Sequence, residues 1–465
     1  MKKKNILYIF ADQWRKKGMG FEGEPVATPA MDKFASESMV FDHAISTYPL
    51  CSPHRGALMT GKYPYSLGLW TNCKIGLDEV VMLKPQEVSI ANVLKKEGYA
   101  TAYIGKWHLD GSEKNFQDTP ESGADNWDAY TPKGERRQGF DYWCSYGAMN
   151  AHLDPHYWQD NNKKVKPKIW SPEFETNLAL DYLENRDQDK PFCMFISWNP
   201  PHPPLDKVPD KYLKTIHQHQ LMANVPDTLK NDPAYIKRVE QYYGAIAGLD
   251  HNFGRIMAYL KEHNLVENTI VVLSADHGEM LGAHGRTGKN IWYEESINIP
   301  FIIRGGGIKA GRTDVLFSSI DHMPTLLDLL GIDIPSTVHG RSFKHVLMHP
   351  SNRADKQQDT VEDEPKSIFL SMIPGLPELV EPYRERGLNN KAFGWRGLRT
   401  KTHTYVVDNG CHPEDKQVRY IYHLKDDPLQ LNPEMVSQDD SRCMAYDHVL
   451  RGYLAKIKDP FLLNR

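Results

Sequence analysis

The sequence predicts an α/β fold: a large, mostly parallel sheet covered by helices on both faces, with a smaller C-terminal subdomain that contains an antiparallel sheet and a helix. Three observations predict it. Short apolar runs, typical of strands buried on both faces, recur along the chain. A long stretch between two of them has helical periodicity. Strand-like alternation reappears near the C-terminus. Strands that alternate with helices are typical of a doubly covered sheet.

The first and larger domain is expected to span residues 1–347. Its predicted strands are residues 6–11, 102–105, 192–197 and 269–274, and its clearest helix is residues 238–263. In that helix the apolar residues from Val239 to Leu260 recur at spacings of three or four. A chain of 465 residues exceeds one ordinary core, so a second domain is expected.

The C-terminal part has a different pattern. Residues 348–366 are charged, contain proline and lack periodicity, which predicts a linker or surface loop. Residues 367–465 are expected to form an α+β subdomain packed on the first domain. Within it, residues 394–408 and 418–424 alternate as strands do, and residues 444–457 are predicted to be a helix.

A short helix is predicted directly after Cys51. Ser52 is a good N-cap, Pro53 suits the first helical position, and Gly61 is a natural helix stop. Cys51 is therefore expected just before a helix N-terminus, where free N–H groups and partial positive charge favour a bound sulfate or phosphate. Arg55, in the first turn, adds a permanently charged guanidinium, whose N–H groups can donate two hydrogen bonds to one anion.

Polar residues follow each of the four predicted strands. In chain order these are Asp12 and Gln13, then Lys106 and His108, then His202, then Asp276 and His277. Ligands of open α/β sheets bind at the carboxyl ends of the strands, so these side chains are expected at one edge. Asp12, Gln13, Asp276 and His277 are the predicted ligands of a divalent cation. Their oxygen-rich set favours Ca²⁺ or Mg²⁺ over zinc.

Several motifs carry a resemblance to a known family. The run Cys51-Ser52-Pro53-His54-Arg55, followed by Thr60-Gly61, resembles the signature of type I, formylglycine-dependent sulfatases of the alkaline-phosphatase-like superfamily. Further blocks match in order over nearly the whole chain: Gly105-Lys106-Trp107-His108, Asn199-Pro200-Pro201-His202-Pro203, Ser274-Ala275-Asp276-His277-Gly278-Glu279 and Gly288-Lys289.

The resemblance implies a modified nucleophile and a cation. Cys51 would be oxidised before folding to formylglycine, by a formylglycine-generating or an anaerobic sulfatase-maturating enzyme. One divalent cation, normally Ca²⁺ with Mg²⁺ or Mn²⁺ as alternatives, would lie beside it. The implied catalytic residues are Cys51, Arg55, Lys106, His108, His202 and Lys289.

The implied mechanism follows from charge. The cation and the basic side chains offset the charge of a sulfate ester, and a hydroxyl of the hydrated formylglycine attacks sulfur. His202, or His108 as the alternative, protonates the departing alcohol. The second hydroxyl of residue 51 then loses its proton, sulfate leaves and the aldehyde returns.

The leading interpretation is hydrolysis of a sulfated carbohydrate. Many sulfatases have Asp-Asp where this chain has Asp12-Gln13, and related phosphonate monoester and phosphodiester hydrolases share the variant, so that activity is the first alternative. A non-catalytic protein that binds sulfated glycans is a third interpretation, which the retention of Cys51 and Arg55 disfavours. Residues 140–158 are rich in aromatic side chains and histidine, and are expected either to form a sugar-binding wall or to pack as a surface loop.

Composition limits the partners. The net charge is −4 without a basic stripe, so no nucleic-acid partner is expected. No apolar stretch is long enough for a membrane span, so no membrane partner is expected. The six cysteines lack the C-x-x-C spacing of zinc sites. The apolar run after the N-terminal lysines is too short for a signal peptide, which predicts a cytoplasmic protein as the sequence stands, or a periplasmic or secreted one if a signal peptide was removed.

Overall fold

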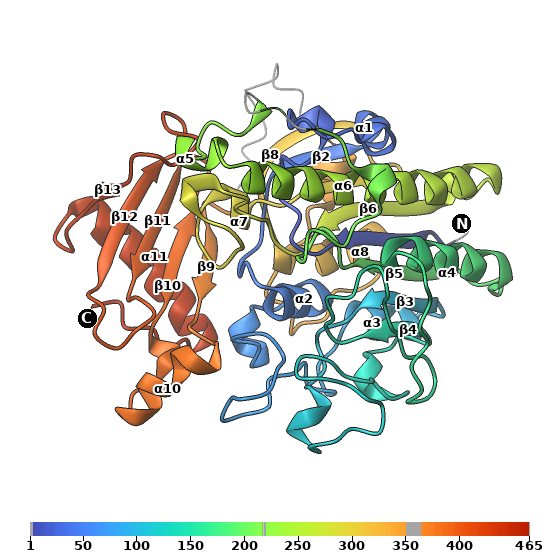
Figure 1. Cartoon of the computed structure of the whole chain (residues 1–465), viewed down its shortest axis with the longest axis horizontal. Helices are drawn as coiled ribbons and strands as arrows, with labels where there is room; N and C mark the ends of the chain where they lie inside the picture. The colour runs from blue at the N-terminus through green and yellow to red at the C-terminus, as the bar shows by residue number, and fades with distance from the viewer. Residues whose placement is uncertain (1–2, 216, 218–219, 350–363, 465) are drawn as a thin grey trace.

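The computed structural model describes residues 3–215, 217, 220–349 and 364–464. Within them the larger sheet has the strand order β4-β3-β5-β1-β6-β7-β2-β8 (Figure 1). Its neighbouring strands are parallel, except that β7 is antiparallel to both β6 and β2. The strands are β1 (Asn5–Ala11), β2 (Met39–Ile45), β3 (Ala100–Lys106), β4 (Tyr142–Tyr146), β5 (Phe192–Trp198), β6 (Thr269–Ala275), β7 (Phe301–Arg304) and β8 (Gly311–Ser318).

The four predicted strands correspond to β1, β3, β5 and β6. Every residue of β1, β5 and β6 is buried, because helices cover both faces of the sheet at this point. These four strands are also neighbours in the order β3-β5-β1-β6 and run in the same direction. Their carboxyl ends therefore meet at one edge, as predicted.

Helices form two groups around this sheet. Helices α1, α4 and α6 pack on one another, as do α2, α3, α8 and α9, and the two groups cover its two faces. None of the described helices is long and apolar enough to cross a membrane. The helices are α1 (Pro29–Ser36), α2 (Cys51–Thr60), α3 (Ile90–Lys96), α4 (Ser171–Asn185), α5 (Asp227–Lys230), α6 (Pro233–Glu262), α7 (Glu294–Ile297), α8 (His322–Leu329), α9 (Lys344–Met348), α10 (Pro377–Glu385) and α11 (Ser441–Ile457).

Helix α6 begins five residues earlier than predicted. The Asp232 side chain accepts a hydrogen bond from the backbone N–H of Ala234, and Pro233 occupies the first helical position. This cap fixes the start of the helix. The apolar periodicity that predicted α6 begins only at Val239.

The start of α2 corrects a prediction. Cys51 is the first helical residue, and the N-cap is Leu50, whose backbone is extended. Ser52 does not cap the helix, because its hydroxyl donates to the carbonyl of His108 at 2.6 Å. Gly61 does end the helix as predicted: its φ is 66° and its N–H donates to the carbonyl of Ala57 at 2.8 Å.

The second sheet is antiparallel throughout, in the order β13-β12-β11-β10-β9, and lies on one side of the larger sheet (Figure 1). Helix α11, predicted as residues 444–457, packs on β10. The two sheets share an apolar cluster in which Ile45 and Tyr48 meet Leu370 and Trp395. The strands are β9 (Ile368–Met372), β10 (Trp395–Arg399), β11 (His403–Asp408), β12 (Val418–His423) and β13 (Glu434–Met435).

The fold class is thus as predicted. The division into residues 1–347 and 367–465 stays a prediction. Most of the predicted linker at 348–366 lies outside the described residues, which omit 350–363.

Candidate active site

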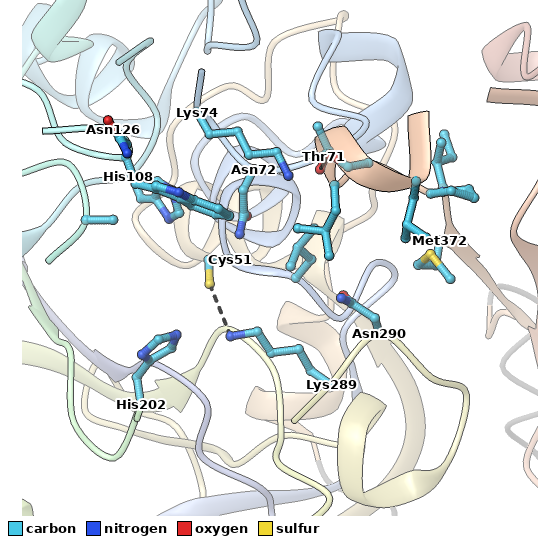
Figure 2. A pocket seen from close by; sticks show the side chains of 18 of the residues that line it. Cys51, Thr71, Asn72, Lys74, His108, Asn126, His202, Lys289, Asn290 and Met372 are labelled. Carbon is cyan, nitrogen blue, oxygen red and sulfur yellow. Dashed lines mark hydrogen bonds between the residues drawn. The ribbon is translucent and has the colours of Figure 1, made fainter. Parts of the chain in front are cut away.

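The ten predicted site residues lie together at the carboxyl edge of the large sheet. Asp12 and Gln13 follow β1, Lys106 ends β3, and Asp276 and His277 follow β6. The remaining residues come from α2 and from loops that border the same cavity: Cys51, Arg55, His108, His202 and Lys289. Figure 2 shows Cys51, His108, His202 and Lys289 around this cavity.

Arg55 joins the two carboxylates. Its Nη2 donates to Asp12 Oδ2 at 3.0 Å, and its Nε donates to Asp276 Oδ2 at 3.1 Å. Its Nη1 donates to the carbonyl of Lys106 and to Ser197 Oγ, both at 2.7 Å. A fully buried guanidinium with four such bonds is fixed in place, so Arg55 sets the distance between the carboxylates.

The carboxylates carry more negative charge than this arginine neutralises. Burial opposes ionisation of Asp12, but Lys106 and Arg55 hold the pKa of that carboxyl well below its usual range. Burial, and then the Asp12 carboxylate, raise the pKa of Asp276 to about 6. A second cation between the two groups would relieve this repulsion.

The donors fit such a cation. One ligand atom from each of Asp12, Cys51, Asp276 and His277 lies within 4.8 Å of the others, and all four residues are buried. His277 Nδ1 lies 3.0 Å from the carbonyl of Gly278, which can only accept, so Nδ1 carries the proton. In the neutral ring Nε2 then offers a lone pair, 3.4 Å from Cys51 Sγ.

Gln13 is held in place rather than free. Its backbone is in the left-handed region, with φ 63°, which is uncommon outside glycine and typical of functional sites. Its amide nitrogen donates to Glu279, and its Oε1 accepts from Lys289 Nζ at 2.5 Å. The amide oxygen has a second lone pair for a cation.

Cys51 lies between two lysine ammonium groups on the one hand and the Asp12 carboxylate, 3.7 Å from its Sγ, on the other. Its side chain is 1% exposed, and its Sγ lies 3.9 Å from Lys106 Nζ and 3.7 Å from Lys289 Nζ. Burial and the Asp12 carboxylate raise the pKa of the Cys51 thiol, but Lys106, Lys289 and His277 lower it more, and the net value falls to about 6. The pocket therefore stabilises an anion at this position.

The two histidines approach from opposite sides of the cavity. His202 Nδ1 lies 2.7 Å from the carbonyl of Pro203, so it carries the proton and leaves Nε2 for the cavity, toward which the ring points (Figure 2). His108 Nε2 lies 3.3 Å from the carbonyl of Cys73, and His108 Nδ1 is buried without a hydrogen-bond partner in the described structure. Burial, and then nearby lysine charge, hold the pKa of both rings well below 6.5.

The cavity around these residues has a volume of about 1030 Å³. The predicted wall at residues 140–158 lines the cavity through Ala148, Met149, Asn150 and His156. Its aromatic side chains Tyr146, Tyr157 and Trp158 are instead buried in a separate apolar cluster. The aromatic side chains that do line the cavity are Trp127, Trp292 and Trp395. No local sequence pattern marks these three residues, because they lie on separate loops and on β10.

Sequence reasoning also missed residues that organise the site. Asn199 accepts from Lys106 Nζ at 3.3 Å, and Asn72 accepts from the N–H of Ser52 at 2.9 Å. Asn199 directly follows β5, so the strand-end rule would have found it. Asn72 and Glu279 lie on loops whose positions depend on tertiary contacts. The sequence motif around Asp276 contains Glu279 but does not indicate its role.

A scan against protein-family models matches the Sulfatase family over residues 4–332. An endo-4-O-sulfatase of Bacteroides thetaiotaomicron is 34% identical to this chain, and the match covers 99% of this chain and 94% of that protein. An ulvan-active sulfatase of Formosa agariphila is also 34% identical, covering 87% of this chain and 73% of that protein.

A solved structure is similar to this chain in fold as well as in sequence. A Bacteroides thetaiotaomicron protein, described with the metabolism of multiple glycosaminoglycans, superposes with a TM-score of 0.86 at 33% identity, covering 99% of this chain and 97% of that one. The fold and the site thus define an alkaline-phosphatase-like hydrolase. The chain belongs to the sulfatase family, and the protein is a sulfuric ester hydrolase.

Proposed function

We propose that the protein hydrolyses sulfate esters of a sulfated carbohydrate, with formylglycine made from Cys51 as the nucleophile and one divalent cation as cofactor. The observation that carries the proposal is the pair of ammonium groups within 3.9 Å of the buried Cys51 Sγ, beside two carboxylates. The relatives named as an endo-4-O-sulfatase and an ulvan-active sulfatase support a carbohydrate substrate.

Asp12, Gln13, Asp276 and His277 would hold the cation. Conversion of Cys51 to formylglycine replaces the sulfur of this cluster with oxygen, which leaves a mainly oxygen set and favours Ca²⁺, with Mg²⁺ or Mn²⁺ as alternatives. When bound, the cation would supply positive charge that offsets the charge of the sulfate and of the attacking oxygen.

Lys106 and Lys289 bind the sulfate oxygens in this proposal. Their positions beside residue 51 hold the sulfur atom within reach of the nucleophile and stabilise charge that develops on the sulfate. Hydrated formylglycine would supply two hydroxyls, one to attack sulfur and one to release sulfate without a separate water. Arg55 positions Asp12 and Asp276 and does not face the substrate directly.

His202 is the proposed acid for the leaving alcohol. In the free protein the ring is neutral, because burial and the lysines lower its pKa. A sulfate monoester adds negative charge beside the ring and raises that pKa, so the ring takes up a proton as the substrate binds. Nε2 then delivers it to the departing oxygen. His108 is the alternative, through its unpartnered Nδ1.

Maturation requires a partner enzyme. Cys51 is 1% exposed and is the first residue of α2, so a formylglycine-generating or anaerobic sulfatase-maturating enzyme that takes an extended segment around residue 51 would act before α2 folds.

A substrate panel tests the proposal. The matured protein is assayed with sulfated saccharides, nitrophenyl sulfate, a phosphodiester and a phosphonate monoester. The highest kcat/KM is expected with a sulfated saccharide, and Cys51→Ala should lose this turnover. A highest kcat/KM with the phosphodiester or phosphonate would support the alternative hydrolase. Tight binding of sulfated glycans without turnover by protein shown to contain the aldehyde would support a binding protein.

A further inference from the structure

A buried lysine outside the sulfate-binding cluster faces the same cavity. Lys74 is 2% exposed, and Figure 2 shows its side chain directed into the cavity beside Asn72. In the part of the chain that the structure describes, no carboxylate lies within ion-pair distance of its ammonium. The group instead lies 4.9 Å from the centre of the Trp127 ring. Burial lowers the pKa of Lys74 to about 8, so it is still charged at pH 7.

Burial of an unpaired ammonium is costly, and proteins offset that cost with an opposite charge. The acidic residues next to Trp127 do not provide it. Asp125 accepts from Lys114 at 2.8 Å, and Asp128 pairs with His156 at 2.6 Å. Glu378, an exposed residue of α10, has a charge that acts on Lys74 but forms no ion pair with it in the described structure. An anionic group of a molecule in the cavity would supply a closer counter-charge.

The loop that carries Lys74 is rigid. The N–H of Cys73 donates to Ser52 Oγ at 3.1 Å, and the carbonyl of Cys73 lies 3.3 Å from His108 Nε2. The carbonyl of Lys74 accepts from Asn115 Nδ2 at 3.2 Å. Because Ser52 adjoins Cys51 on α2, the backbone of Lys74 has a fixed position relative to the nucleophile. A preorganised charge of this kind binds a ligand group with little loss of side-chain entropy.

Lys74 does not belong to the group that contacts residue 51. Lys106 and Lys289 lie within hydrogen-bonding distance of Cys51 Sγ, and among described residues Lys74 does not contact that atom. Because Lys74 lies outside hydrogen-bonding distance of residue 51, its ammonium can meet a group of the saccharide other than the sulfate under attack. Trp127 is 38% exposed and lines the cavity next to Lys74, where its ring is available to the face of a sugar.

We propose that Lys74 and Trp127 form a second subsite, which takes an acidic group, a carboxylate or a second sulfate, on the same saccharide as the sulfate ester that is hydrolysed. This inference rests on the proposed function. It makes the enzyme selective for polyanionic saccharides over neutral sugars that carry a single sulfate.

Three defined disaccharides test this subsite. Each carries the same scissile sulfate, and the second sugar is neutral, a uronic acid, or sulfated. For the wild-type protein, kcat/KM should be higher for at least one of the two dianionic substrates, and the preferred one identifies the group. In Lys74→Met this selectivity ratio should fall about 10- to 100-fold, mainly through KM, as expected for loss of one charged hydrogen bond. Lys74→Arg keeps the charge and should retain most of the selectivity.

The outcomes separate this inference from the proposed function. Sulfate release from all three substrates without preference in the wild type would overturn the subsite, even if Lys74→Met does not fold. An unchanged selectivity ratio in folded Lys74→Met would overturn it as well. No sulfate release from any saccharide, by protein shown to contain the aldehyde at position 51, would overturn the proposed function itself.

Discussion

The ion pair between Glu294 and Arg399 joins α7 to the second sheet, and its loss is expected to destabilise the protein. Glu294 begins α7, five residues after Lys289, and Arg399 ends β10. Arg399 Nε donates to Glu294 Oε1 at 2.7 Å, and Arg399 Nη2 donates to Oε2 at 3.1 Å. Asn298 Nδ2 adds a third bond at 3.0 Å. Glu294→Gln keeps the shape of the side chain and removes its charge.

The magnitude follows from the pKa of Glu294. Burial raises it, but Arg399 lowers it more, from 4.5 to about 2. This difference of about 2.5, at about 1.4 kcal/mol for each pKa unit, corresponds to about 3.5 kcal/mol. The Glu294 side chain is 21% exposed, and solvent screening reduces the expected loss of unfolding free energy to about 2 to 3 kcal/mol.

The direction in which this stabilisation changes with pH follows from the direction of the pKa shift. Because the folded-state pKa of Glu294 is lower than that of the unfolded chain, the stabilisation is present above pH 4.5 and is lost as the pH falls from 4.5 toward 2. Urea unfolding is measured for wild type and Glu294→Gln between pH 7 and pH 3. Tryptophan fluorescence and circular dichroism are both recorded, because a chain with two sheets need not unfold in one step.

Glu295→Gln is the matched control. Glu295 is the next residue of α7 and is half-buried, and its Oε1 accepts from Asn224 Nδ2 at 2.6 Å. Since it has no ion pair in the described structure, its neutralisation should cost less than about 1 kcal/mol. Equal losses in the two variants, or a loss in Glu294→Gln that grows as the pH falls, would refute the role given to Arg399.

Two further predictions concern the active site. His202→Ala should lower kcat/KM for sugar sulfates by about 10²- to 10⁴-fold, and much less for nitrophenyl sulfate, whose leaving group needs little protonation; equal losses would make His202 a binding residue and His108 the better candidate acid. Chelation should lower both turnover and melting temperature, and Ca²⁺ at about 100 times its Kd should restore about 2.7 kcal/mol of stability; no rise in melting temperature with Ca²⁺, Mg²⁺ or Mn²⁺ would argue against the cation site of Asp12 and Asp276.

The central strands were predictable because they are buried on both faces. Such strands are continuous apolar runs, and β1, β5 and β6 have no exposed residue to interrupt them. In β2 the half-buried pair Asp42 and His43 interrupts the run, and the first half of β8 is polar and partly or fully exposed. These two strands therefore carried no such signal.

The site was predictable where the chain topology alone places a residue. Asp12, Lys106 and Asp276 lie at or just after the ends of neighbouring parallel strands, so the sheet brings them together. Lys74 and Asn72 lie on a loop whose position depends on hydrogen bonds to Ser52 and His108. No local pattern encodes those contacts, and only the folded structure reveals them.

The most direct test of the central claim relates activity to the chemical state of residue 51. Preparations made with and without the maturing enzyme contain different fractions of formylglycine, which mass spectrometry of the peptide containing position 51 measures. The sulfate released per minute from a sulfated saccharide should be proportional to that fraction and should extrapolate to zero for the unmodified thiol. Turnover by protein that contains only cysteine at position 51, at a rate equal to that of matured protein, would contradict the proposed nucleophile.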